Sequence, residues 1–203
     1  MSIILAVRSS RAAVVAADSQ RVSSSGVSEA PYEKTFQVGS LIGACAGLLE
    51  FSGLDVKSHI SRALDGKHLR PRDAAHAIEA YLSPILEATA DDEVGFQHRC
   101  LDVIVASRDP RIASVRLFPN LALRRIEAEY AENDFLLTAG TEQAKSEVIR
   151  SLRRPARRLD YGSEELRALA RRAIESAIIL GGPHRLHPNV PSCCGPVSLR
   201  HVS

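Results

Sequence analysis

Aromatic residues are scarce in this chain of 203 residues: they make up 4% of it, and tryptophan is absent. Because 45% of the residues are nevertheless hydrophobic, a core has to be filled by valine, leucine, isoleucine and alanine. That length and that hydrophobic content are typical of one compact domain with a single core. We therefore expect residues 1–203 to form one domain.

Long hydrophobic runs are also missing, since no apolar run approaches the roughly 20 residues of a membrane-spanning helix. The first seven residues are too short for the apolar part of a secretion signal, and Arg8 and Arg11 follow them in place of a cleavage site. These absences favour a cytoplasmic protein without a membrane partner.

Charge of one sign does not dominate either, because 26 basic residues face 24 acidic ones and the net charge is only +2. This balance predicts no general attraction to nucleic acid. The chain has four cysteines, which in a cytoplasmic protein need no disulfide. We expect Cys45 and Cys100 to be thiols of the buried core.

The chain does contain three polar residues at equal spacing near its start. Asp18 lies sixteen positions after Ser2, and Lys34 lies sixteen positions after Asp18. Removal of Met1 would leave Ser2 as the first residue, with a hydroxyl beside its own α-amine. A serine hydroxyl attacks an amide only when a base takes its proton, and an α-amine with a pKa near ~7.7–8.0 can act as that base. An internal serine has no such partner.

The residues between these positions predict strands that bring them together. Residues 3–7 and 12–17 are apolar runs joined by a polar turn, which is typical of a hairpin. A hairpin places the end of its second strand, and thus Asp18, near the start of the first. Lys34 opens a third run at 35–47, whose small and apolar residues favour a buried strand pair.

In these features the chain resembles the proteasome-type N-terminal nucleophile (Ntn) hydrolases, that is, proteasome β subunits and their bacterial relatives. The resemblance rests on the AADS sequence of residues 16–19, on Lys34 with the strand after it, on GACAGL at 43–48, and on END at 132–134 before an apolar strand. It implies an α+β fold, a four-layer αββα sandwich, with no cofactor and no metal.

The resemblance also implies roles for individual residues. Ser2 would be the nucleophile and, through its amine, the general base; Asp18 would orient the site; Lys34 would lower the pKa of the hydroxyl; and Gly47 would donate an N–H to the oxyanion. The implied pocket for the side chain before the cleaved bond is lined by four residues. They are Arg21, Tyr32, Cys45 and Leu49. Such a pocket would accept an apolar or acidic side chain.

Most members of the family have threonine as the first residue, where this chain would have Ser2, and two later positions also differ from the family's pattern. The family has a Gly-Ser-Gly turn where residues 139–141 read AGT, and an acid and a serine after the last long helix where residues 180–183 read LGGP. The family's partners would be a peptide or an unfolded protein, and further copies of the chain in one or more rings. Ring size and any ATPase partner are left open by the resemblance.

Spacing along the chain gives an order of elements. Helical periodicity and capping residues predict helices at 48–64, 71–89, 142–152 and 163–180. Strands are expected at 3–7, 12–17, 35–47, 101–106, 112–118, 121–130, 135–139 and 197–202. Periodicity alone indicates an α+β protein. Residues 181–196 interrupt the pattern and are expected to be an inserted loop.

Two other groups of residues have ordinary explanations beside functional ones. Five arginines between 150 and 158 are followed by acidic residues, which favours a solvated linker over a phosphate site. His184, His187, Cys193 and Cys194 have zinc chemistry, but adjacent cysteines are unusual as ligands.

Three hypotheses therefore remain. The chain is an N-terminal serine hydrolase that cleaves peptide bonds in an oligomeric chamber, a catalytically silent subunit of a proteasome-like assembly, or a metal-binding domain that uses its His/Cys segment.

Overall fold

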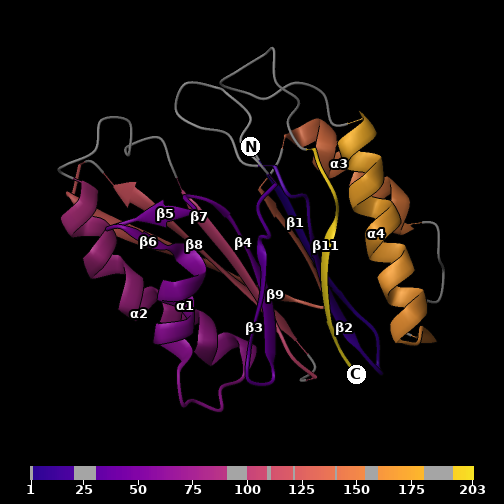
Figure 1. Cartoon of the computed structure of the whole chain (residues 1–203), viewed down its shortest axis with the longest axis horizontal. Coiled ribbons are helices and arrows are strands. Elements are labelled where there is room, and N and C mark those ends of the chain that lie inside the picture. Colours follow the sequence, from indigo (N-terminus) through magenta and orange to yellow (C-terminus); the bar gives the residue numbers. More distant parts are fainter. Residues whose placement is uncertain are drawn as a thin grey trace.

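The computed structural model places the chain in four layers, with two β-sheets face to face between two pairs of helices (Figure 1). The structure describes residues 2–20, 31–90, 100–108, 111–120, 122–139, 141–153, 160–180 and 194–203. No helix in these ranges is long and apolar enough to span a membrane. The observed layers confirm the expected α+β fold.

Within the described residues, the strands form two main sheets and one short hairpin. The four-stranded sheet has the order β10 (Phe135–Ala139), β1 (Ile3–Arg8), β2 (Ala13–Ala17), β11 (Ser198–Val202). The five-stranded sheet has the order β3 (Thr35–Val38), β4 (Leu41–Gly47), β7 (Leu101–Ala106), β8 (Ile112–Asn120), β9 (Arg125–Asn133). The hairpin joins β5 (Glu50–Phe51) to β6 (Leu54–Asp55).

Helices cover the outer face of each sheet. In Figure 1, α3 (Glu142–Arg153) and α4 (Ser163–Leu180) lie beside the four-stranded sheet. On the opposite side, α1 (Val56–Leu64) and α2 (Pro71–Ala90) pack against the five-stranded sheet. Each pair of helices contributes buried aliphatic side chains to one outer core, and a third core lies between the sheets.

Strand β1 is buried on both faces, which explains its uninterrupted apolar sequence. Ile3 and Leu5 pack in the core under α3 and α4, while Ile4 and Ala6 pack between the two sheets. Because successive side chains of a strand point to opposite faces, only a continuous apolar run satisfies both cores. The first strand is therefore held at the centre of the molecule.

Most elements agree with the sequence-based predictions, and two boundaries were wrong. The helix predicted over 48–64 begins only at Val56, because residues 50–55 form the β5–β6 hairpin, whose turn has Ser52 and Gly53 at positive φ. Asp55 then begins the helix by accepting a hydrogen bond from the Lys57 amide at 2.6 Å.

The strand predicted over 121–130 begins at Arg125 and continues to Asn133. A turn precedes it, in which the Leu123 amide donates to the carbonyl and to the side chain of Asn120, and Arg124 has a φ of 50°. Leu123 and Arg124 are not typical turn residues, so no signal in the sequence indicated a loop here. The loop predicted at 181–196 falls outside the described residues up to position 193.

Candidate active site

A buried ion pair joins the two sheets at one end. Asp18 follows β2, Lys34 precedes β3, and the lysine Nζ lies 3.0 Å from Asp18 Oδ1. Both side chains are fully buried, with 0% exposure. Asp18 is also fixed through its other contacts, since Oδ1 accepts from the Ile3 amide at 2.8 Å and Oδ2 from the Gln20 amide at 3.1 Å. The carboxylate is therefore held in one orientation.

Ser2 lies next to this pair. Its neighbour Ile3 donates its amide to the same carboxylate oxygen that Lys34 contacts, and the Asp18 amide donates to the Ile3 carbonyl at 3.3 Å. Ser2 itself is half-buried. The hairpin thus brings Asp18 to the start of β1, as predicted, and Ser2 directly precedes the residue whose amide binds this buried pair.

Gly47 ends β4 in a conformation that needs glycine. Its φ is 90°, and an ideal Cβ at this position would lie 1.8 Å from the Cys100 carbonyl oxygen. The Leu48 amide donates to that same oxygen at 3.1 Å, so β4 and β7 stay paired beyond Gly47. The chain therefore passes too close to β7 for any side chain.

The direction of the Gly47 N–H follows from the pleat of β4. The Cys45 amide points toward β3 and donates to the Lys34 carbonyl at 3.1 Å. Successive amides along a strand alternate in direction, so the Gly47 N–H points to the same side as that of Cys45. The last registered pair of β3 and β4 is Thr35 with Ala44. Gly47 lies beyond this pair, so its N–H points toward the segment that contains Lys34 and precedes β3.

The predicted pocket residues do not all have the same surroundings. Tyr32 is half-buried, its amide donates to the Ser19 carbonyl at 2.8 Å, and its hydroxyl donates to Asp55. Leu49 is buried in the core under α1 and α2. Arg21 lies outside the described residues.

Cys45 is buried beneath this site. Its thiol donates to the Lys34 carbonyl at 3.5 Å. Burial, with a further contribution from the negative charge of Asp55, raises the pKa of the Cys45 thiol to about 12. It therefore stays protonated at neutral pH and is no competing nucleophile. Cys100 is only half-buried, so the prediction that it belongs to the buried core was wrong.

Sequence analysis did not identify two groups of interacting residues that the structure shows. Asp55 receives the Tyr32 hydroxyl, and the Lys57 ammonium lies 4.6 Å from the centre of the Tyr32 ring. The helix predicted over 48–64 places Asp55 and Lys57 in its interior, although an aspartate two positions after a glycine is a capping signal. The second group surrounds Asp102, and its signal was an acid inside the apolar run of residues 101–106.

Metal-binding groups are not formed by the described part of the chain, where no three His, Cys, Asp or Glu residues are placed to hold an ion together. His184, His187 and Cys193 of the alternative zinc hypothesis lie outside the described residues. Cys194 is half-buried.

No family model matches the chain, and no curated protein matches its sequence. Solved structures do match. HslV from Trypanosoma brucei superposes with a TM-score of 0.61 at 14% identity, covering 99% of both chains. An Anbu mutant from Hyphomicrobium sp. strain MC1 gives 0.64 at 19% identity, covering 98% of this chain and 80% of that one. A second Anbu structure gives 0.57 at 18% identity, covering 97% and 80%.

The chain has the proteasome-like Ntn-hydrolase fold. This confirms the resemblance and the expected four-layer αββα sandwich. At these identities the agreement lies in the arrangement of strands and helices over nearly the whole chain. In this fold, Lys34 contacts Asp18, and Asp18 binds the amide of the residue that follows Ser2.

Proposed function

We propose that the protein is an N-terminal serine hydrolase that cleaves peptide bonds after Met1 has been removed. One observation carries this proposal: Asp18 Oδ1 binds both the Lys34 ammonium and the amide that follows Ser2. Stability alone does not require this ion pair, because an apolar contact would hold the sheets together equally well. A buried ammonium beside a serine hydroxyl, by contrast, favours the deprotonated form of the hydroxyl, which is the form that attacks.

The proposed reaction uses the chain's own groups. The α-amine of Ser2 takes the proton of the hydroxyl, and Oγ attacks the carbonyl carbon of the peptide bond. The Gly47 N–H donates to the resulting oxyanion, while Lys34 stabilises negative charge on the attacking oxygen. As the C–N bond breaks, the ammonium of Ser2 returns the proton to the leaving amine. The remaining ester is hydrolysed by water, which the same amine activates as a general base.

Substrates would be peptides or unfolded proteins, and the chain would associate with further copies into rings. We place the activity in the cytoplasm. We propose that the pocket for the side chain before the cleaved bond prefers an apolar or acidic side chain. Its lining would be Arg21, Tyr32, Cys45 and Leu49. The Lys57 ammonium, 4.6 Å from the centre of the Tyr32 ring, supports the preference for an acidic side chain because it places a cation beside a proposed pocket residue.

A peptide epoxyketone tests the nucleophile directly, because it forms a doubly linked adduct only with a hydroxyl and a free α-amine on one residue. We expect mass analysis of the N-terminal peptide to find this adduct on Ser2, and no adduct on the variant Ser2→Ala. Retention of Met1 would refute the catalytic proposal. A free but unlabelled Ser2 would favour the second candidate.

The second candidate is a catalytically silent subunit, and the turn before α3 favours it. The Thr141 hydroxyl accepts from the Ala144 amide at 3.0 Å, so it caps α3. The residue before it is glycine rather than serine. Normal assembly of a protein that neither cleaves peptides nor reacts with the epoxyketone would support this candidate.

A further inference from the structure

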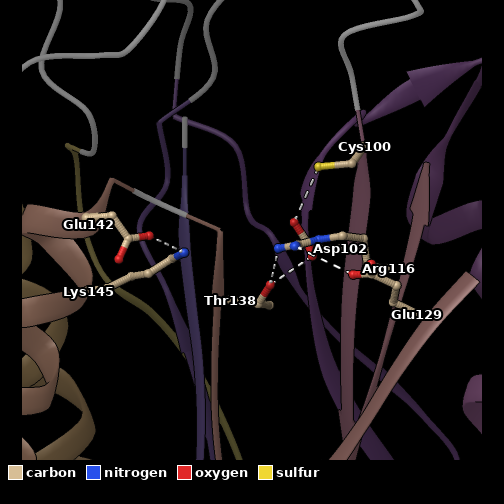
Figure 2. Close-up of polar contacts among 7 residues, drawn as sticks. All are labelled: Cys100, Asp102, Arg116, Glu129, Thr138, Glu142 and Lys145. Carbon is tan, nitrogen blue, oxygen red and sulfur yellow. Dashed lines mark hydrogen bonds and ion pairs between the residues drawn. The ribbon is translucent and has the colours of Figure 1, made fainter. Parts of the chain in front are cut away.

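A second cluster of charged and polar side chains lies between the sheets, centred on the buried Asp102 of β7 (Figure 2). Its Oδ1 accepts from Arg116 Nε at 2.8 Å and from the Thr138 hydroxyl at 2.8 Å. Arg116 Nη2 donates in turn to Thr138 at 3.1 Å, which closes a triangle of hydrogen bonds. Burial, with the negative charge of Asp102, raises the pKa of the Cys100 thiol to about 11, so Cys100 stays protonated and donates to Asp102 Oδ2 at 3.6 Å.

This cluster connects both sheets at the level of the candidate site. Thr138 belongs to β10 and lies opposite Ile4 of β1, two residues from Ser2. Asp102 lies opposite Ala46 of β4, one residue from Gly47. The triangle therefore links the strand beside the nucleophile to the strand beside the oxyanion donor. Within this cluster, the hydrogen bonds that cross between the sheets are those of Thr138 with Asp102 and Arg116, and the Asp18–Lys34 ion pair joins the same two sheets.

A buried carboxylate of this kind is not explained by stability alone. The Asp102 side chain is 4% exposed, and apolar residues of similar volume are often equally or more stabilising than a buried ion pair. The triangle of hydrogen bonds instead fixes the relative positions of the strands that it joins. The hydrogen bonds from Thr138 to Asp102 and from Arg116 to Thr138 fix where β10 lies against β7 and β8, which packing of the small residues around them would fix less sharply.

We propose that Asp102, Arg116 and Thr138 act as positioning residues, which set the distance between Ser2 on the β1 side and the Gly47 N–H on the β4 side. The proposal rests on the proposed function, because that distance matters for the attack and for the oxyanion. It predicts a loss in the chemical step without a loss of substrate binding, since the proposed pocket residue Tyr32 lies on the side of β3.

Thr138→Val tests this with little change of volume. We expect kcat on a fluorogenic peptide to fall about 10- to 100-fold, as for a small misplacement of reacting groups, while KM stays within about twofold. Thr138→Ser keeps the hydroxyl and should recover most of the activity. Thr89→Val is the matched control, because that hydroxyl bonds Ile85 and Ser52, on α2 and the β5–β6 turn. A kcat of Thr138→Val within twofold of the parent would overturn the proposal.

A second variant and a second measurement cover the remaining outcomes. Arg116→Lys keeps the charge but loses the arginine geometry, and it should repeat the kcat loss if Thr138→Val does not fold. If the parent is inactive and unlabelled by the epoxyketone, the proposed function has failed, and hydrogen exchange then decides on the positioning role. In Thr138→Val, amides in residues 2–8 and 41–48 should exchange about tenfold faster while α2 is unchanged. Unchanged or uniformly faster exchange would overturn it.

Discussion

At the scale of residues, equal spacing predicted a three-dimensional contact. Asp18 and Lys34 stand sixteen positions apart, and they form a fully buried pair that binds the amide of Ile3, the residue after Ser2. The approach of Asp18 to the start of β1 could be predicted because a tight hairpin fixes which residues meet at its ends, whereas Lys34 precedes a strand of the other sheet and was placed beside Asp18 through the resemblance. The sequence could not predict the Asp102 cluster, whose members come from β7, β8 and β10 and meet only when both sheets are assembled.

The buried thiol of Cys45 should make the protein less stable as the pH rises into the alkaline range. Its pKa is about 12 in the folded chain, against an ordinary value of 9.0. Between these values the unfolded chain releases a proton that the folded chain keeps, so the free energy of unfolding falls as pH rises, by about 1.4 kcal/mol per unit. Below pH ~8 both states hold the proton, and no such loss occurs.

Urea unfolding of the parent and of Cys45→Ala at pH 7.5 and pH 10.5, under reducing conditions, measures this effect. The parent should lose about 2 kcal/mol more than the variant between the two values. Other groups that ionise in this range are common to both proteins and cancel in the comparison. An equal loss in parent and variant would contradict the assigned cause.

At the scale of elements, alternation and helical spacing located most strands and helices but not their ends. Helix α4 begins and ends where the spacing predicted, because Ser163 and two glutamates mark its first turn. The apolar residues at 48–51 agree equally well with a helix and with a short hairpin. Packing of Phe51 in the core under α1 and α2, where it stacks on His59, decided between them.

The end of β4 allows a test of what Gly47 does. Gly47→Ala adds a methyl group both at positive φ and against the Cys100 carbonyl, whereas Gly66→Ala adds it at a φ of 66° in open space. Strain alone should lower the free energy of unfolding by about 1 kcal/mol in Gly66→Ala. Gly47→Ala should lose clearly more, about 3 kcal/mol, because β4 and β7 must also separate.

Urea unfolding curves of the two variants give this difference, and activity adds a second readout. Gly66 follows α1, away from the site, so Gly66→Ala should retain parental activity while Gly47→Ala loses it. Similar unfolding free energies for the two variants would show that β4 can move away from Cys100 without cost. The close approach of the strands would then not explain the glycine.

At the scale of the whole molecule, the four layers were predicted through the resemblance rather than through periodicity, which indicates only α+β content. The solved structures of HslV and Anbu agree with the layers at identities of 14–19%. The extent of residues 1–203 as a single domain stays a prediction. So does assembly into rings, which depends on surfaces between copies.

Light scattering coupled to gel filtration tests the assembly. The chain has a mass of 22.0 kDa, and the proposed rings require a particle of several times that mass. We expect Ser2→Ala to give the same particle as the parent, because the nucleophile takes part in no predicted contact between copies. A monomer at micromolar concentration for both proteins would contradict the assembly proposal.

The pairing of β1 has a consequence for the order of events during synthesis. One edge of this strand meets β2 at once, but its other edge meets β10, where Ile3 pairs with Ala139. Contacts between such distant segments form late in folding. While the ribosome is still adding the middle of the chain, the bond between Met1 and Ser2 has no completed sheet around it. The removal of Met1 that the proposed function requires would therefore find this bond accessible on a nascent chain, before the sheet closes.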